Sequence, residues 1–333
     1  MSTLATPVTD PRQSPVAAFD VPLRPLHGGR NALEGLGACT CGARVPLQVR
    51  LGLRSRTRPV FESRWSCGAA CLEARIAFAV RRETKREPVR RQHEHRIPLG
   101  LLLLSNGLIT QEALRRALEL QRGTGERIGE ILTRECGVPE RKVAAALATQ
   151  WGCPMWEVSG SLDRMSAVAP AAVLKRGGIL PLRLFREGRS DEAVLPRESR
   201  LAVAFAHAID PQVVFALRWM HDVAVDAGVA PVSQWAKGQE RMLQAQGVAA
   251  EEVDCSSTLD MQQTIVRTLR RLQPVESRWA RVHDVYWLRL WLEPAALLGG
   301  PHQTEDVVDF IYRLPEASMV GESAQHDAHS YRA

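Results

Sequence analysis

The sequence lacks several features that define large classes of proteins. No run of apolar residues approaches the roughly 18–20 that a membrane-spanning helix requires, and the best runs, 99–104 and 201–209, are far shorter. The N-terminus has no basic segment followed by an apolar one, which argues against a secretory signal. No G-x-x-x-x-G-K-[ST] motif occurs, and no nucleophile–base constellation stands out. We therefore expect a cytoplasmic protein that is not an enzyme and that a partner can recruit to the inner membrane.

Aromatic residues are also scarce, at 5% of the 333 residues, although eight of them are tryptophans. Apolar residues make up 45% and charged residues 24%, an ordinary balance for a globular protein. The seven cysteines are expected to be thiols or metal ligands rather than disulfides, because export is not indicated. The net charge of +6 is compatible with an anionic partner, or simply with a solvated basic surface.

Composition and periodicity divide the chain into segments of α+β character, with a tandem helical-hairpin repeat followed by a small α/β domain. Strands are predicted over 179–185, 200–206, 221–230 and 282–292, and helices over 211–220, 233–246 and 258–273. The predicted segments are a disordered leader (1–36), a candidate treble-clef zinc module (37–80), a basic linker (81–96), a tandem-repeat helical domain (97–155), an α/β part (156–246), a C-terminal helix–strand extension (247–314) and a disordered tail (315–333).

Four of the cysteines form two local pairs, Cys39 with Cys41 and Cys67 with Cys71. Four thiolates in two pairs suit tetrahedral Zn²⁺, and a short segment with little core needs such a staple. The second pair, C-x₃-C at an expected helix start, resembles treble-clef zinc fingers of the MYM/TRASH kind, whereas the first pair is C-x-C rather than the usual C-x₂-C. These four residues are the candidate zinc ligands. Ordinary reduced thiols in a poorly ordered segment are the alternative.

A repeat lies between residues 98 and 150. Residues 98–121 align with residues 127–150 at an offset of 29 positions, and each unit is predicted to be a short helix, a break and a longer helix. In each unit a helical apolar stripe ends in glutamine, through Leu114, Leu118 and Gln121 in the first and Val143, Leu147 and Gln150 in the second. Two packed hairpins with both glutamines in water would explain this spacing. The other interpretation is that the two glutamine side chains form hydrogen bonds with a bound ligand.

The doubled pattern R-L-G, an apolar pair, Gly, another apolar pair and L-x-x-x-L-x-x-Q resembles the MshE-type N-terminal domain of type II secretion and type IV pilus ATPases. The following segment, which includes GGILPLRLF and RLAVAFAHAID, is similar to the α/β remainder of the same domain. The resemblance covers about residues 96–246 and does not extend to an ATPase domain. It implies binding of cyclic di-GMP, whose two phosphates and two guanines suit a doubled motif.

The resemblance implies a role for each residue type in the motif. Glycines would let backbone N–H groups approach a phosphate, apolar side chains would cover guanine faces, and glutamine and arginine would bond base edges and phosphates. The residues expected to bind cyclic di-GMP are Arg96, Leu99, Gly100, Leu103, Gly107, Leu114, Leu118, Gln121, Arg127, Ile128, Gly129, Leu132, Leu147 and Gln150.

Two positions depart from the family pattern. Pro98 stands where the family has arginine, with Arg96 two residues upstream as a substitute, and Cys136 stands where the family has glycine. The loss of one guanidinium–phosphate contact would cost about 1–3 kcal/mol, or roughly tenfold to a hundredfold in affinity.

The function expected from the sequence is that of a regulatory adaptor that binds cyclic di-GMP and acts on a secretion, pilus or envelope-polysaccharide protein. A scaffold that binds protein through the same helices, with a degenerate nucleotide site, is the alternative. A nucleic-acid regulator that uses the cysteine module and basic linker is less favoured, because no base-reading helix is recognised.

Overall fold

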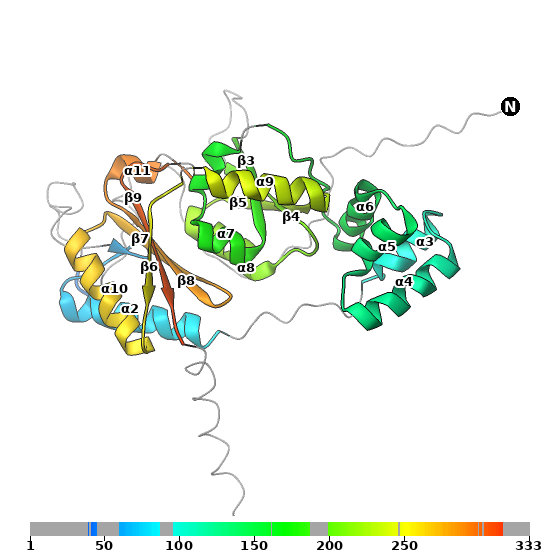
Figure 1. Ribbon diagram of the computed structural model, residues 1–333. Coiled ribbons are helices and arrows are strands. Elements are labelled where there is room, and N and C mark those ends of the chain that lie inside the picture. The colour runs from blue at the N-terminus through cyan, green and yellow to red at the C-terminus, as the bar shows by residue number, and fades with distance from the viewer. Residues whose placement is uncertain are drawn as a thin grey trace, which may run out of the picture.

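The computed structural model describes residues 39, 41–44, 60–86, 96–160, 162–186, 199–245, 247–298, 300–301 and 303–315. The predicted disordered leader, the middle of the predicted linker and nearly all of the predicted tail lie outside these residues. The fold mixes helices and sheets, as the α+β prediction expected. A four-helix unit lies at one end, an α/β unit in the middle and a second, larger sheet at the other end (Figure 1). Within the described residues no helix combines the length and apolar character needed to cross a membrane.

The helical unit contains two short helices and two longer ones. They are α3 (Leu99–Ser105), α4 (Gln111–Thr124), α5 (Ile128–Cys136) and α6 (Glu140–Trp151). The Thr110 side chain caps α4 by accepting a hydrogen bond from the Ala113 N–H, and Gly125 ends the helix in the left-handed conformation. The core of the unit is formed by Leu103, Ile131 and Leu132, which are fully buried.

The middle unit surrounds a three-stranded sheet with short helices. Its elements are the 3₁₀ helix η2 (Asp163–Ala167), α7 (Ala171–Gly177), β3 (Ile179–Arg186), β4 (Ser199–Phe205), α8 (Pro211–His221), β5 (Ala224–Val229) and α9 (Val232–Gln244). β4 lies between β3, which is antiparallel to it, and β5, which is parallel to it. The strand predicted over 221–230 begins later, because His221 still belongs to α8 and Asp222 ends that helix in the left-handed conformation.

The C-terminal sheet has four strands in the order β6-β9-β8-β7. Its elements are β6 (Ala250–Asp254), α10 (Thr258–Leu272), β7 (Glu276–Val282), β8 (Val285–Trp291), α11 (Pro294–Leu298) and β9 (Val307–Arg313). The strand predicted over 282–292 was wrong at its start, because Val282 ends β7 and a tight turn at His283, which has a φ of +55°, separates it from β8.

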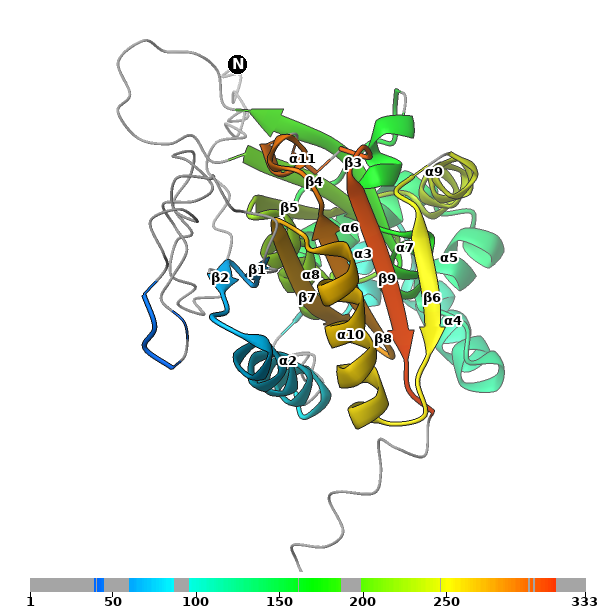
Figure 2. The same cartoon turned by 90° about the vertical axis from the view of Figure 1, so that its left-hand side faces the viewer.

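An N-terminal segment covers one face of this sheet. The hairpin β1 (Val60–Phe61) and β2 (Arg64–Trp65) leads into α2 (Ala69–Thr84), which lies beside α10 on one face of the four strands (Figure 2). Apolar side chains of α2, including Leu72 and Ile76, share a core with Trp279 and Tyr286 of the sheet. Residues 81–84, predicted to begin the linker, are the last turn of α2.

The other face of the C-terminal sheet packs against the middle unit. Val282, Trp287 and Ile311 belong to the same buried cluster as Leu217 of α8 and Leu174 of α7. Both faces of the sheet are therefore covered, which explains why every residue of β7 and β8 is buried.

Candidate functional site

The two glutamines of the repeat donate to equivalent carbonyls, Gln121 locally and Gln150 over 53 positions of the sequence. Gln121 Nε2 donates to the Glu126 carbonyl at 3.1 Å, and Gln150 Nε2 donates to the Ile97 carbonyl at 2.7 Å. Ile97 and Glu126 are 29 positions apart, the same offset that relates the two glutamines. Each glutamine therefore holds the chain just before the short helix of the other unit, and the two bonds form a reciprocal pair.

The basic residues next to these carbonyls have different surroundings. The Arg96 guanidinium stacks over the Trp151 ring, 3.4 Å from its centroid, and its Nη1 atom is buried without a hydrogen-bond partner among the residues that the structure describes. Burial lowers the pKa of Arg96. Arg127 is exposed at the N-cap of α5, and no ion pair with it occurs among the described residues. Arg127 is thus accessible to a ligand, whereas the Arg96 guanidinium is held against Trp151, and the repeat pairs Arg127 with Pro98 rather than with Arg96.

Gly100 and Gly129 are buried where two helices approach closely. A Cβ atom at Gly100 would lie 2.5 Å from Leu114 Cδ1, and one at Gly129 would lie 2.9 Å from Val143 Cγ1. Leu114 and Val143 are themselves equivalent in the repeat. In each unit the glycine thus allows the short helix to pack closely against the long helix. The sequence analysis had expected the glycines to contact a phosphate instead.

The apolar residues of the motif divide into a core set and an accessible set. Leu99, Leu103, Leu114 and Leu132 are buried, so their side chains form the core in this structure. Leu118 is 41% exposed, and Ile128 and Leu147 are half-buried. Gly107 is exposed after α3, with a φ of +67°. Ile97 and Leu101, which the sequence did not single out, are also exposed apolar residues, and Trp151 lies directly after Gln150.

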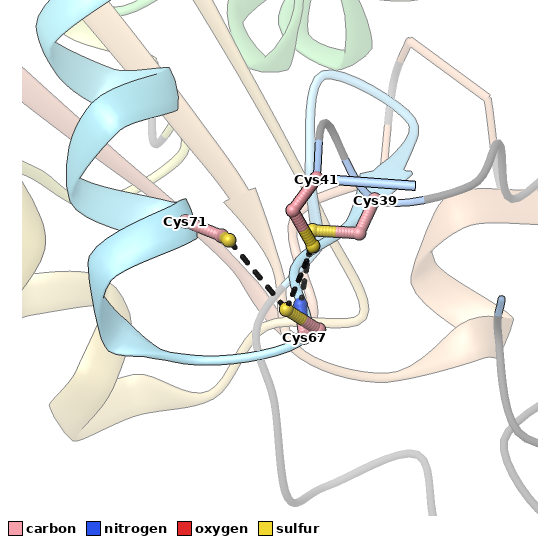
Figure 3. Close-up of side chains that lie close together, drawn as sticks. All are labelled: Cys39, Cys41, Cys67 and Cys71. Atoms are coloured by element: carbon pink, nitrogen blue, oxygen red, sulfur yellow. Dashed lines mark hydrogen bonds between the residues drawn. The ribbon is translucent and has the colours of Figure 1, made fainter. Parts of the chain in front are cut away.

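The four cysteines of the two pairs converge, although they come from separate segments (Figure 3). Their sulfur atoms all lie within 4.8 Å of one another. Cys41 Sγ is 3.3 Å from Cys67 Sγ, and Cys67 Sγ is 3.5 Å from Cys71 Sγ. Four cysteine sulfurs grouped in this way are able to hold a metal ion. Mutual hydrogen bonds among the thiols, first with Cys41, raise the pKa of Cys67 to about 12.

The three remaining cysteines lie apart from this cluster. Cys255 is buried, and Cys136 and Cys153 are half-buried. Burial raises the pKa of both Cys153 and Cys255 to about 11, so neither is a ready thiolate.

The helical unit contacts the middle unit through polar residues. Glu140 Oε2, at the start of α6, accepts hydrogen bonds from the N–H and hydroxyl of Ser233 on α9. His207 lies 3.5 Å from Glu130, and Met155 forms an isolated bridge with Val229 of β5. A change in the packing of α5 or α6 would therefore alter these contacts with the middle unit.

No family model matches the chain. Over 91 residues, 27% of the chain, the sequence is 41% identical to the type IV pilus assembly ATPase PilB of Thermus thermophilus. The match spans 10% of the length of that ATPase. This similarity confirms the resemblance to the secretion and pilus ATPase family that the doubled motif indicated.

Two solved structures are also similar to parts of the chain. A structure of MshE with cdg, that is, cyclic di-GMP, is 27% identical, covers 44% of this chain and 99% of its own, and has a TM-score of 0.33. A structure of the N-terminal domain of XpsE is 20% identical, covers 43% of this chain and 92% of its own, and has a TM-score of 0.29.

Proposed function

We propose that this chain is a non-catalytic regulatory adaptor that binds cyclic di-GMP through the helical unit of residues 96–151. The observation that carries the proposal is the reciprocal pair of glutamine hydrogen bonds, because it relates the two halves of the doubled motif in three dimensions. A ligand with two equivalent halves suits a protein site with two equivalent halves.

Charge and apolar surface support this ligand. Arg127 is exposed and therefore suited to donate to an anionic phosphate oxygen, whereas Arg96, whose Nη1 is buried, would first have to leave the Trp151 ring. The exposed side chains of Ile97, Leu101 and Leu118 offer apolar surface for the flat guanine rings. The glutamines act in this proposal by positioning the two arginine-bearing chain ends, and their Oε1 atoms remain acceptors.

Binding is proposed to regulate a partner through the contact between the helical and middle units. A ligand shifts an equilibrium only by its difference in affinity for two states. The Glu140–Ser233 contact is the described link through which a repacked α6 would alter the middle unit. The partner is proposed to be a protein of a secretion, pilus or envelope-polysaccharide system, since the PilB relative is a pilus assembly ATPase.

The second candidate function is a protein-binding scaffold with a degenerate nucleotide site. Three of the five large, exposed apolar side chains of the described residues, Ile97, Leu101 and Leu118, lie in the helical unit. Single exposed apolar residues are common on protein surfaces, so this observation favours a docking face less strongly than the reciprocal glutamines favour a two-part ligand.

The proposal includes one metal ion. The Cys39, Cys41, Cys67 and Cys71 cluster is proposed to bind Zn²⁺, because four thiolates in a tetrahedral arrangement prefer this ion. Four protein ligands leave no open coordination position, so the ion has a structural rather than catalytic role.

Equilibrium dialysis with labelled cyclic di-GMP tests the nucleotide site residue by residue. Arg127→Ala is expected to weaken binding roughly tenfold to a hundredfold through the loss of one charge-assisted contact. Arg115→Ala is the matched control, since Arg115 is 83% exposed on α4 and its described ion-pair partner is Glu119. Equal affinity of both variants and the unchanged chain would remove Arg127 from the site, and absence of binding by the unchanged, folded chain would favour the scaffold.

A further inference from the structure

We propose that the zinc centre at Cys39, Cys41, Cys67 and Cys71 is charge-balanced by Arg75 and fastens the segment of Cys39 and Cys41 to the start of α2. The inference rests on the Zn²⁺ of the proposed function and goes beyond it, because it assigns the centre an outer-sphere cation and a mechanical role. The cysteine segment is then a layer of the C-terminal domain rather than a separate adaptor module.

The local backbone is built to bring the first two sulfurs inward. Gly42 adopts a φ of +85°, its N–H donates to the Cys39 carbonyl at 2.9 Å, and the Cys39 N–H donates to the Ala43 carbonyl at 3.1 Å. The Cys67 N–H points to Cys39 Sγ at 3.4 Å. Zn–S bonds of about 2.3 Å place tetrahedral sulfurs roughly 3.8 Å apart, which is close to the spacings of 3.3 and 3.5 Å within the cluster.

The charge of the centre matches its position at the start of α2. Four thiolates and one Zn²⁺ carry a formal net charge of about −2. The N-cap residue of α2, Gly68, makes no side-chain capping bond, and the first turn contains no acidic residue. Within the part of the chain that the structure describes, the positive end of the helix dipole therefore has no anionic side-chain cap, and a zinc tetrathiolate supplies negative charge there.

Arg75 gives a second, independent indication of an anion at this place. It lies one helical turn after Cys71 on the same side of α2 and is 7% exposed. Its Nη1 donates to the Arg64 carbonyl at 2.7 Å, but its Nε and Nη2 are buried without hydrogen-bond partners among the described residues. A buried guanidinium with unpaired N–H groups is costly unless negative charge lies beside it. Thiolates of a zinc centre accept such N–H groups, which also tunes the affinity for the metal.

The sheet holds the rest of the segment by two buried charged side chains of β7. Glu276 accepts hydrogen bonds from the N–H and hydroxyl of Ser63 in the β1–β2 turn. Arg281 donates to the carbonyl oxygens of Glu83, Thr84 and Arg86, at the C-terminal end of α2. Only the start of α2 has no such attachment to β7 among these contacts, and the cysteine cluster lies there. The metal would therefore join the segment of Cys39 and Cys41 to a layer that β7 already holds at its hairpin and at the end of α2.

The test uses the full chain. Elemental analysis of purified protein is expected to find about one zinc per chain, and competition with a chromogenic chelator then measures the affinity. Arg75→Gln is expected to weaken zinc binding roughly tenfold to a hundredfold, whereas Arg81→Gln, at an exposed position of the same helix, should leave it unchanged. Hydrogen exchange before and after chelation is expected to show faster exchange in residues 65–75 than in β8.

The possible outcomes distinguish the presence of the metal from the role of Arg75 and from the fastening role. Absence of zinc from the folded chain, together with no uptake of added Zn²⁺, would overturn both the metal and the inference. A stoichiometric zinc that Arg75→Gln binds as tightly as the unchanged chain would keep the metal and overturn the role of Arg75. Unchanged exchange in residues 65–75 after complete metal removal would overturn the fastening role.

Discussion

Several charged side chains lie in the interior and connect parts of the chain that are distant in sequence. The strongest example is Arg289 of β8, which makes a two-bond ion pair with Asp309 of β9 and donates to the carbonyls of Ala167 and Val168. Trp287 Nε1 also donates to Asp309, which is fully buried. Because the partners belong to the C-terminal sheet and to η2 with its following residue, this network specifies how the two units face each other.

Removal of one member of this network leaves the other charge buried without compensation. Arg289→Met is expected to destabilise the protein by about 3–5 kcal/mol, measured as a lower urea midpoint. Arg176→Met removes an exposed pair with Asp284 and should cost at most about 1 kcal/mol. Similar midpoints for the two variants would contradict a stabilising role of the buried network.

The buried side chain of His221, beside the same network, should make the stability of the protein depend on pH. Burial, followed by the positive charge of Arg289, lowers its pKa well below 6.5, and its Nε2 lies 2.7 Å from the Val168 carbonyl. The charged groups that face it are Arg289 and Arg278. The unfolded chain therefore binds a proton that the folded chain does not, and stability falls as the pH decreases below about 6.5, by at most about 1.4 kcal/mol per pH unit.

Urea midpoints between about pH 7.5 and 5 measure this effect. His221→Gln is expected to flatten the decline, because glutamine can still donate to the Val168 carbonyl but does not titrate. His207→Gln, at a partly exposed ion pair with Glu130, is the control. A decline of the same slope in the unchanged chain and in His221→Gln would contradict the assignment.

At the scale of elements, strongly periodic segments were predicted well and polar-looking buried strands were not. The amphipathic helix at 258–272 and the strands β3 and β4 differ from their predictions by at most one residue at each end. β7 was missed because its sequence, ESRWARV, contains three charged residues, all of which are buried through long-range partners. The turn at His283 also lacks the glycine or asparagine that usually signals a hairpin.

In the candidate sites, too, local features were predictable from the sequence and long-range contacts were not. The pairing of the cysteines was visible in the sequence, because the residue type and local spacing carry the signal. The placement of α2 on the C-terminal sheet was not visible, since it depends on contacts between residues about 200 positions apart. For the repeat, the sequence indicated that the glutamines need partners, but only the structure shows which carbonyls they reach.

The glycines of the repeat give a prediction at the level of helix packing. Gly129→Ala places a methyl group 2.9 Å from the branched side chain of Val143, which has little freedom to move, and is expected to cost about 1–3 kcal/mol. Gly123→Ala is the control, because its added Cβ meets nothing within 4 Å and alanine favours the helix α4. Thermal unfolding should therefore shift downward for the first variant and not for the second.

In the molecule as a whole, segments from near the two ends of the described chain pack together. The β1–β2 hairpin and α2 form one domain with the C-terminal sheet, and the helical and middle units lie between them in sequence (Figure 1). The helical unit therefore follows, in sequence, a segment that side chains of β7 hold, and precedes the middle unit. A ligand that repacks the helical unit would act against these two fixed attachments.

Deletion of the N-terminal layer tests this arrangement. A chain that begins at residue 96 is expected to bind the dye ANS and to unfold at a lower temperature, because the face of Trp279, Tyr286 and Phe310 loses its cover. A chain that begins at residue 37 keeps every contact described above and should behave as the full chain does. Equal ANS binding by the two deletions would contradict the discontinuous domain.

In the proposed function the doubled helical unit binds a two-part nucleotide. Calorimetric titration of cyclic di-GMP into the full chain tests this binding, with Gln121→Ala/Gln150→Ala as the comparison. We expect micromolar or tighter binding by the unchanged chain, and loss of binding by a double variant that keeps its circular dichroism spectrum. No heat at high micromolar ligand with folded protein, or equal affinity of the two proteins, would contradict it.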